Sequence, residues 1–469
     1  MTGRPGIDGI PLRVCVIGSG PSAFYATEAL FKAADLNVTV DMFDRLPTPF
    51  GLVRGGVAPD HQKIKSVAKV YEKVATNDGF RFFGNVMLGR DLQVEDLEKH
   101  YHMVVWGTGC ESDNKLGVQG NDLQGVHSAT EFVGWYNGHP DFRDRVFDLA
   151  NAKSVAVIGN GNVAMDVSRV LLKDPEALAS TDIADHAVEA LRASNVREVF
   201  LLGRRGPAQA AFSPKEIAEI DALDNVAVTV TAEEAAIDDY SREWLESQPR
   251  SAKRNVDFIE QRAAATDESA PRKLHCRFLV SPVEFQANGS RVAKVRVQHA
   301  ELKPDDHGTP RPQSIDRYET IDADLVFAAI GYRGDPIPGL SFEERKGIVP
   351  NRDGRVLDAP DGSVRVGHYV VGWAKRGPTG LVGTNSPDSK ATVESMLQDL
   401  DQGLTLQAPA SGPDEIQSLL AGRDLDFVSW EDWRRLDAWE QEEGKARGKV
   451  RFKEPSVEGL MAAVRNLRS

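Results

Sequence analysis

Short apolar runs bounded by glycines or polar turns organise the N-terminal part of the chain. The runs LRVCVI and VTVDMF, at Leu12–Ile17 and Val38–Phe43, have the continuous apolar character of strands buried in a parallel sheet. Residues 21–34 between them are expected to form a helix. A helix, short strands and another buried strand are expected next, at residues 63–77, 81–86 and 102–109. This order predicts a parallel α/β unit.

The same pattern begins again at Ser154. SVAVIGNGNVAMDVSRVLL repeats the strand, the glycine-containing loop and the helix, and REVFLLGRRG at residues 197–206 supplies the next strand. Residues 174–193 interrupt this pattern and are expected to form an inserted helical segment. The charge-rich residues 233–272 suit exposed helices and a mobile loop. The sequence therefore predicts a second α/β unit.

β-strands dominate after Lys273. LHCRFLVSPVEFQ and RVAKVRVQHAEL alternate with period two about a turn at Asn288-Gly289. A hairpin-like segment then leads to a buried strand at residues 323–333. The segment at residues 369–384 precedes a helix that should end near residue 401.

The tail after Ala408 predicts one helix. Ser429 and Asp432 have the spacing of a capping box at its start. Three tryptophans of this tail are expected to pack it onto the body of the protein: Trp430, Trp433 and Trp439.

The first glycine loop, Gly18-Ser-Gly20-Pro-Ser-Ala23, joins a strand to a helix. Glycine permits a tight turn and close approach of the backbone to a pyrophosphate, and the N-terminus of the following helix offers N–H groups. Asp44 ends the next strand, where a carboxylate would accept hydrogen bonds from ribose hydroxyls. The alternative is a plain turn residue.

The second glycine loop, Gly159-Asn-Gly161-Asn-Val-Ala164, has the same context, but the next strand ends in Arg204-Arg205. A guanidinium pair can bind a 2′-phosphate, which favours NADP(H) over NAD(H). The alternative is a solvated pair in a loop. Together the two loops predict FAD in the first unit and NADP(H) in the second.

These units predict an α/β fold with two Rossmann-like dinucleotide-binding domains. The glycine-ended strands WGTG and AAIG flank the second unit, so the NADP domain is expected to be inserted into the FAD domain. The expected division is residues 1–112 for the first part of the FAD-binding domain, 113–330 for the NADP-binding domain, and 331–469 for the second FAD part with a C-terminal helical tail.

Composition restricts the possible partners. The chain has 469 residues, a mean hydropathy of -0.35 and a net charge of -14, from 56 basic and 70 acidic residues. This balance disfavours general binding of nucleic acid or anionic membranes, but a local basic patch can still bind an acidic partner. No apolar run approaches the ~20 residues of a membrane span, and the N-terminus shows no charged-then-apolar leader. A cytoplasmic protein is expected.

The three cysteines, Cys15, Cys110 and Cys276, lie far apart, without a CxxC or CxxxxC pair. A redox-active disulfide is therefore not expected, and a four-cysteine iron–sulfur cluster cannot form within this chain. No metal site is expected. Each cysteine is most simply a small buried hydrophobic residue.

Six segments carry a family resemblance: VIGSGPSAF, PTPFGLVRGGVAPDH, FFGNV, VIGNGNVAMDV, GRRGPAQAAF and VVGWAKRGPTGLVGT. Spread over roughly residues 12–400, they make the chain similar to the adrenodoxin-reductase family of ferredoxin–NADP⁺ reductases. The resemblance implies a bilobal enzyme with non-covalent FAD. It also implies hydride transfer from NADPH to flavin N5, followed by single-electron transfer to an iron–sulfur ferredoxin that feeds a cytochrome P450 or similar acceptor.

The resemblance also implies site residues, by position. Besides Gly18 and Gly20, the FAD contacts would be Ser22, Asp44, Leu52, Val86, Trp373, Gly380, Leu381 and Val382. The NADP contacts would be Asn162, Val163, Ala164, Met165, Arg204, Arg205, Glu216 and Gly380. One departure is Asn114, where some relatives carry an arginine; Lys115 is adjacent.

His61 and Glu219 match the pair that the family places beside the nicotinamide and the flavin. His61 could orient water or donate to the flavin edge, and Glu219 could balance charge. Composition alone favours a turn histidine and a helix-surface glutamate; the match to the family motif favours the catalytic role of His61. Trp373 is either a core aromatic residue or a platform that covers the flavin.

An NADPH:ferredoxin oxidoreductase is thus expected, with an acidic ferredoxin as partner. Its docking cations would include Arg54, Lys375 and Arg376, whereas the run RSAKR at residues 250–254 is more simply a solvated surface. A disulfide reductase is not expected, because it would need a cysteine pair. A glutamate-synthase-type small subunit is not expected either, because it would need a cysteine-rich N-terminal domain. A flavin-dependent NADPH oxidase or monooxygenase, and a non-catalytic nucleotide-binding electron-transfer subunit, remain alternatives.

Overall fold

The computed structural model describes residues 4–7, 9–265, 269–407, 412 and 414–469. The chain divides into two compact units. The first comprises residues 1–57, 61–113 and 331–469, and the second comprises residues 58–60 and 114–330. The second unit is therefore an insertion in the sequence of the first, and three residues just before His61 also belong to it.

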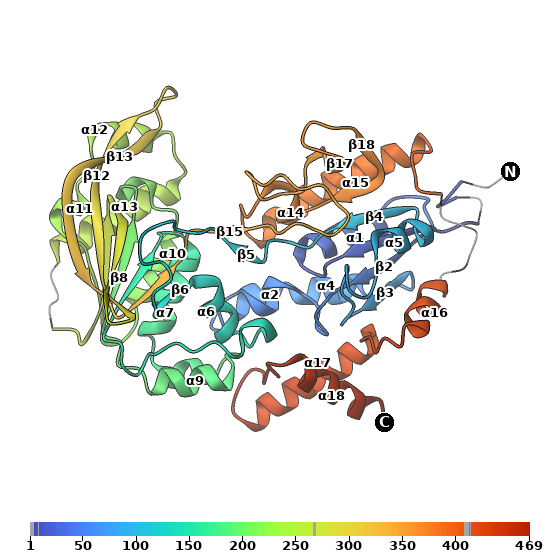
Figure 1. The fold of residues 1–469 in the computed structure, drawn as a ribbon, viewed down its shortest axis with the longest axis horizontal. Coiled ribbons are helices and arrows are strands. Elements are labelled where there is room, and N and C mark those ends of the chain that lie inside the picture. The colour runs from blue at the N-terminus through green and yellow to red at the C-terminus, as the bar shows by residue number, and fades with distance from the viewer. Residues whose placement is uncertain (1–3, 8, 266–268, 408–411, 413) are drawn as a thin grey trace. The chain divides into compact units, whose positions relative to one another are not determined.

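A seven-stranded sheet forms the centre of the first unit, with the strand order β16-β17-β18-β4-β1-β2-β3 (Figure 1). The strands from β18 to β3 are parallel, and β16 and β17 add an antiparallel edge. The strands are β1 Leu12–Ile17, β2 Val38–Phe43, β3 Phe80–Phe83, β4 Met103–Trp106, β16 Asn351–Arg352, β17 Arg355–Leu357 and β18 Val364–Val370. A separate antiparallel pair is formed by β5 Ser112–Asp113 and β15 Tyr332–Arg333.

Helices of the first unit cover this sheet because their apolar faces pack into its core. The hydrophobic residues of β1 are buried, and Leu12, Val14 and Val16 pack in one core cluster with residues of α1 and α15. The helices are α1 Pro21–Phe31, α2 Leu52–Gly55, α3 Gln62–Lys65, α4 Ala68–Val74, α5 Val94–His100, α14 Trp373–Arg376, η3 Val382–Thr384, α15 Asn385–Asp401, α16 Glu415–Gly422, α17 Trp430–Ala446 and α18 Val457–Arg468.

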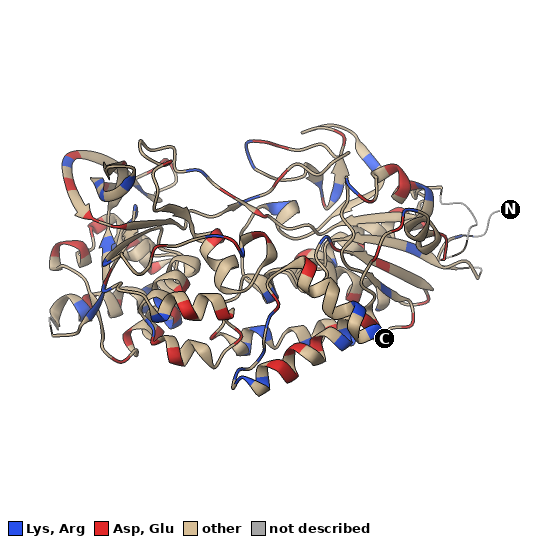
Figure 2. Cartoon of the chain, turned by 60° about the horizontal axis from the view of Figure 1, so that its bottom comes forward, with Lys and Arg blue, Asp and Glu red and all other residues tan. Residues whose placement is uncertain are grey.

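The second unit contains a six-stranded parallel sheet with the order β6-β14-β7-β8-β10-β9 and an antiparallel sheet β11-β12-β13. The strands are β6 Val126–Ser128, β7 Ser154–Ile158, β8 Glu198–Gly203, β9 Val226–Thr229, β10 Arg272–Phe278, β11 Val280–Asn288, β12 Arg291–Pro304, β13 Pro310–Asp322 and β14 Leu325–Ala328. The helices are α6 Ala129–Tyr136, η1 Pro140–Phe142, α7 Asn162–Leu172, α8 Pro175–Ala179, α9 Asp185–Arg192, η2 Pro207–Gln209, α10 Pro214–Asp221, α11 Ala232–Ala235, α12 Asp239–Glu246 and α13 Arg250–Ala264. Figure 2 shows cationic and anionic residues interspersed along the helices.

The expected strands Leu12–Ile17 and Val38–Phe43 are confirmed, as are the inserted helices and the turn at Gly289, which has φ +65°. The alternating run after Lys273 is not one hairpin strand. Leu279, at φ +57°, ends β10, which pairs in parallel with β8 and β9, and the hairpin begins only at β11. Residues 266–268, inside the expected mobile loop, lie outside the described residues.

The C-terminal tail holds three helices, not one; residues 408–411 and 413 lie outside the described residues. The capping box is confirmed, because Ser429 N donates to the Asp432 carboxylate at 2.9 Å and Asp432 N donates to Ser429 Oγ at 3.2 Å. Trp430 lies 5.7 Å from the Phe80 ring, so it packs the tail onto the sheet. Trp439 instead packs within the tail, against Phe452.

Asn114 lies at the first crossing of the chain into the second unit. Its exposed side-chain amide donates to the carbonyl of Ile330, at the return crossing, over 3.5 Å. In this chain the amide thus contacts the backbone of its own unit.

Candidate functional site

The first glycine loop follows β1, which has β4 on one side and β2 on the other. Ligands of open α/β sheets bind where neighbouring strands diverge in this way. Gly18 has φ +94°, and a Cβ there would lie 2.4 Å from the Gly107 carbonyl oxygen. A Cβ on Gly20 would meet no atom within 4 Å. No side chain caps the N-terminus of α1 and its first turn contains no acid, so the loop is open and suited to a pyrophosphate.

Asp44 organises this loop from the end of β2. Its half-buried carboxylate accepts hydrogen bonds from the Ser19 hydroxyl and, at 2.9 Å each, from the backbone N–H groups of Ser19 and Leu46. Loss of water around it raises the pKa of the Asp44 carboxyl group. The carboxylate therefore stands directly beside the loop, as ribose binding requires.

The segment PTPFGLVR also lies against the loop. Phe50 N donates to the Ser19 carbonyl at 3.0 Å, and a Cβ on Gly51 would lie 3.1 Å from the Gly20 Cα. Phe50 has φ +85°, an unusual value for a bulky residue and one that often marks a functional site. Leu52, the first residue of α2, is half-buried beside this segment.

A second segment of the first unit reaches the start of α1. A Cβ on Gly372 would lie 2.4 Å from Ser22 Oγ, so only glycine fits there. The next residue, Trp373, has its ring 5.2 Å from that of Tyr332. Trp373 Nε1 is buried without a hydrogen-bond partner among the described residues. Because an unsatisfied buried N–H is costly, this group fits an acceptor on a bound molecule.

The remaining expected FAD contacts differ in exposure. Val86 is buried in the core, whereas Leu381 is 68% exposed. Gly380 is also exposed, at φ +83°, and Val382 is half-buried. Residues 380–382 therefore present backbone and apolar surface outward, available to a ligand.

The second glycine loop follows β7, which lies between β14 and β8. Gly159 has φ +131°, and a Cβ there would lie 2.4 Å from the Ala329 carbonyl oxygen. A Cβ on Gly161 would meet no atom within 4 Å, and no side chain caps α7. Asn160 Nδ2 is buried without a partner among the described residues. This loop also fits a pyrophosphate, with Asn162, Val163, Ala164 and Met165 in the first turn of α7.

Arg204 and Arg205 follow β8 directly. Arg204 is exposed and Arg205 is half-buried. Neither side chain has a hydrogen-bond or ion-pair partner among the described residues. Burial, and then the neighbouring charges of Arg204 and Arg311, lower the pKa of Arg205. Two adjacent unneutralised guanidinium groups favour binding of an anion.

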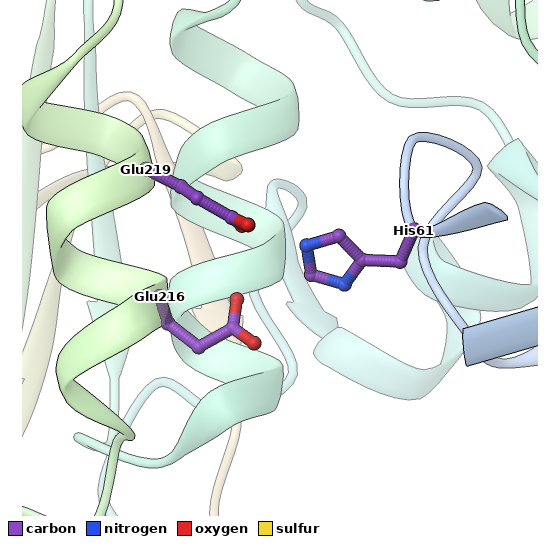
Figure 3. Close-up of side chains that lie close together, drawn as sticks. All are labelled: His61, Glu216 and Glu219. Carbon is purple, nitrogen blue, oxygen red and sulfur yellow. The ribbon is translucent and has the colours of Figure 1, made fainter. Parts of the chain in front are cut away.

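Glu216 and Glu219 leave α10 from the same side, one turn apart (Figure 3). Glu216 is 6% exposed and accepts a hydrogen bond from Arg169 Nη1 at 3.0 Å. Glu219 is more exposed, pairs with Lys215 at 3.1 Å and lies 3.9 Å from Arg169 Nη1. Sequence reasoning missed Arg169. Its signal was a charged residue on a helix whose other residues are mostly apolar.

His61 belongs to the first unit, where it is the N-cap residue of α3 and 7% exposed. Its carbonyl oxygen accepts a hydrogen bond from Ile64 N at 2.9 Å. Its side chain is also drawn in Figure 3. Its catalytic role stays a prediction.

The three cysteines all lie in the described part of the chain, and each is free and buried. Burial raises the pKa of Cys15, and it raises the pKa values of Cys110 and Cys276 to about 12. Buried thiols of this kind are unreactive, and their burial confirms the prediction that each cysteine is a small buried hydrophobic residue.

The three expected docking cations are engaged within the first unit. Arg54 forms a bidentate ion pair with the buried Glu440, at 2.8 and 2.6 Å. Lys375 and Arg376 both pair with Asp388, at 3.1 and 3.4 Å. Because these cations already have carboxylate partners, the structure does not support them as a docking patch.

Comparison with known proteins places the chain in a family. Residues 12–361 match the model of the family described as pyridine nucleotide-disulphide oxidoreductase. The chain belongs to this family. Among the described residues, no helix has the length and apolar character needed to cross a membrane.

Relatives within this oxidoreductase family are similar over nearly the whole chain. NADPH-ferredoxin reductase FprA of Mycobacterium tuberculosis is 41% identical over 459 residues, which cover 96% of this chain and 98% of the relative. The mitochondrial NADPH:adrenodoxin oxidoreductase of Arabidopsis thaliana is 40% identical, covering 97% and 96%. The structure of M. tuberculosis FprA in complex with NADPH has a TM-score of 0.91, with 97% of this chain and 99% of that chain covered. The resemblance to the adrenodoxin-reductase family and the fold with two dinucleotide-binding domains are confirmed.

Proposed function

We propose that the protein is an NADPH:ferredoxin oxidoreductase that holds FAD in its first unit and NADP(H) in its second. One observation carries this proposal: two open, uncapped glycine loops are followed by opposite charges, Asp44 after the first and the unpaired Arg204-Arg205 after the second. The similarity to proteins named NADPH-ferredoxin reductase and NADPH:adrenodoxin oxidoreductase supports it.

The first unit would bind FAD through the glycine loop, Asp44 and the segments of Leu52 and Trp373. The backbone N–H groups at the start of α1 would contact the pyrophosphate, and Asp44 the ribose. The unpartnered Trp373 Nε1 would donate a hydrogen bond to the bound group. Ser22 supports the Trp373 segment by packing against Gly372, and Val86 is part of the core beneath.

The second unit would bind NADPH through the start of α7, with the 2′-phosphate held by Arg204 and Arg205. When bound, NADPH supplies a hydride to the flavin, and the flavin supplies single electrons to an iron–sulfur ferredoxin. The chain's own part is to hold the two groups in a reactive geometry and to exclude water. His61 would orient water or donate to the flavin edge, and Glu219 would balance charge.

The partner would be an acidic ferredoxin, and the enzyme would belong to the class of ferredoxin–NADP⁺ reductases. The protein would be located in the cytoplasm. The expected domain roles are FAD binding by residues 1–112 and 331–469 and NADP binding by residues 113–330. Burial of all three cysteines as free thiols argues against disulfide reduction.

Anaerobic mixing with NADPH tests the proposal. The purified yellow protein should bleach within seconds, and cytochrome c should be reduced by NADPH only when a ferredoxin is added. A protein that stays yellow would be a non-catalytic nucleotide-binding subunit. Rapid NADPH oxidation by O₂ without ferredoxin would favour the oxidase or monooxygenase alternative.

A further inference from the structure

One arginine in the second unit is surrounded by carboxylates. Arg169, on α7, is 1% exposed. Its Nε and Nη2 donate to the two oxygens of Asp60, at 3.0 Å each. The same guanidinium group donates to Asp166 at 2.7 Å and to Glu216 at 3.0 Å. All three nitrogens of the planar guanidinium group thus donate to carboxylates, a geometry that the single ammonium group of lysine cannot reproduce.

Arg169 lies among several carboxylates at once. Four carboxylates lie within 4 Å of its nitrogens, those of Asp60, Asp166, Glu216 and Glu219. The other cations are Lys173, 2.9 Å from Asp60, and Lys215, 3.1 Å from Glu219. Arg169 contacts both Asp166 and Glu216, so one guanidinium group joins carboxylates of α7 and α10. Without it, these carboxylates would repel one another at short range.

Asp60 illustrates how strongly the arginine acts. Burial alone would raise the pKa of Asp60, but the hydrogen bonds and charges of Arg169 and Lys173 hold it well below its usual range. Asp60 is thus ionised and fixed in the second unit at neutral pH.

We propose that Arg169 is a positioning residue of the oxidoreductase site, an inference that rests on the proposed function. Its guanidinium group holds Glu216 and Glu219 on α10, and also Asp60, in one arrangement. It touches no reacting atom. It acts through Glu216, a proposed NADP contact, and Glu219, the proposed charge-balancing residue.

Arg169→Met tests this role, because it keeps the apolar stem and removes the charge and the donors. The rate constant of flavin reduction at saturating NADPH, measured by anaerobic stopped flow, should fall by ~10²-fold, the loss typical of misplaced reactive groups. The dissociation constant for NADP⁺, measured by difference absorbance, should change far less, because the glycine loop and Arg204-Arg205 remain. Arg169→Lys should recover only part of the rate.

Arg277→Met is the matched control in the same unit. Arg277 also forms a network of ion pairs, half-buried, with Glu234 at 2.6 Å and Glu319 at 2.7 Å. Its loss should lower the thermal midpoint without changing the rate of flavin reduction. If Arg169→Met does not fold, Lys173→Met, which removes one contact to Asp60, should still slow flavin reduction relative to Arg277→Met.

A normal rate in folded Arg169→Met, or an equal loss of rate in Arg277→Met, would overturn the inference. A normal rate in Lys173→Met, where that variant replaces Arg169→Met, would overturn it too. A wild-type protein that NADPH does not reduce would instead overturn the proposed function, and this inference with it.

Discussion

At the residue scale, the sharpest contrast is between the carboxylate after one glycine loop and the arginines after the other. Arg204 and Arg205 have no partner among the described residues, so their charge is available to a 2′-phosphate. Changing both to alanine should raise the KM for NADPH strongly and leave the KM for NADH nearly unchanged. The lost hydrogen bonds to a charged group correspond to roughly 1.5–3 kcal/mol of binding free energy. Steady-state kinetics with both coenzymes measure this. Equal losses for NADH and NADPH would show that the arginines do not bind the 2′-phosphate.

A second prediction at this scale concerns His102. Its Nδ1 accepts a hydrogen bond from Arg13 N at 3.0 Å, which requires a neutral imidazole. Burial, and then the charge of Arg13, lower the pKa of His102 to about 4. Because the unfolded state binds the proton more tightly, this residue's stabilising contribution is complete above its unfolded pKa near 6.5. As pH falls toward 4, this contribution to the free energy of unfolding is lost, and the loss is at most about 3 kcal/mol.

His102→Asn tests the assignment, because an amide oxygen can accept the same hydrogen bond without titrating. The thermal midpoint of wild type minus that of the variant should decrease as pH falls from about 7 to 5. A difference that does not change with pH would show that His102 does not titrate in this way.

At the element scale, the C-terminal tail holds α2, the helix that begins with Leu52. Glu440 on α17 is fully buried and pairs with Arg54 of α2 and, at 3.0 Å, with Arg451. Lys453 donates to the Arg54 carbonyl at 3.0 Å. Glu440→Gln would leave two cations without their shared carboxylate, at a cost of roughly 3–5 kcal/mol. Denaturant titration measures the loss, and FAD should be released more easily.

Glu443→Gln is the control on the same helix. Glu443 pairs with Arg447 at 3.1 Å, and both side chains are about two-fifths exposed. An exposed pair of this kind contributes roughly 0–1 kcal/mol. If both variants lose the same stability, the buried Glu440 does not fix the tail onto α2.

The same scale shows what the sequence could and could not predict. Apolar runs and glycine loops were sufficient for β1, β2, β7 and β8, because a buried parallel strand has a strong local signal. The end of β10 depended on Leu279 at positive φ, which its residue type does not reveal. The ion pairs of the candidate docking cations could not be predicted, because the carboxylates that pair with Arg54, Lys375 and Arg376 lie far away in sequence or on another helix.

Some residues of the candidate site could likewise be predicted from the sequence, and others could not. Asp44 and Arg204 were readable because each directly follows a strand of a recognisable motif. The contact between Asp60 and Arg169 joins residues 109 positions apart, and no periodicity links them. Long-range ion pairs of this kind become visible only in the folded chain.

At the scale of the whole molecule, charge governs how a partner approaches. The chain carries a net charge of -14, and Figure 2 shows both signs interspersed over its elements. The proposed acidic ferredoxin would therefore have to overcome general repulsion and be attracted by a local group of cations. Exposed cations without a carboxylate partner among the described residues include Lys69 and Lys73 on α4, and Arg250, Lys253 and Arg254 on α13.

Because such attraction acts between exposed charges, salt should weaken it. Ionic strengths well above physiological, where the screening length falls below about 8 Å, should slow ferredoxin reduction at limiting ferredoxin. Flavin reduction at saturating NADPH is the internal control, since its groups are already bound, and it should change little. Stopped-flow traces of the flavin and the cluster resolve the two steps. Ferredoxin reduction that quickens with salt would mean that repulsion dominates the encounter, and the proposal of an acidic partner with a basic docking face would fail.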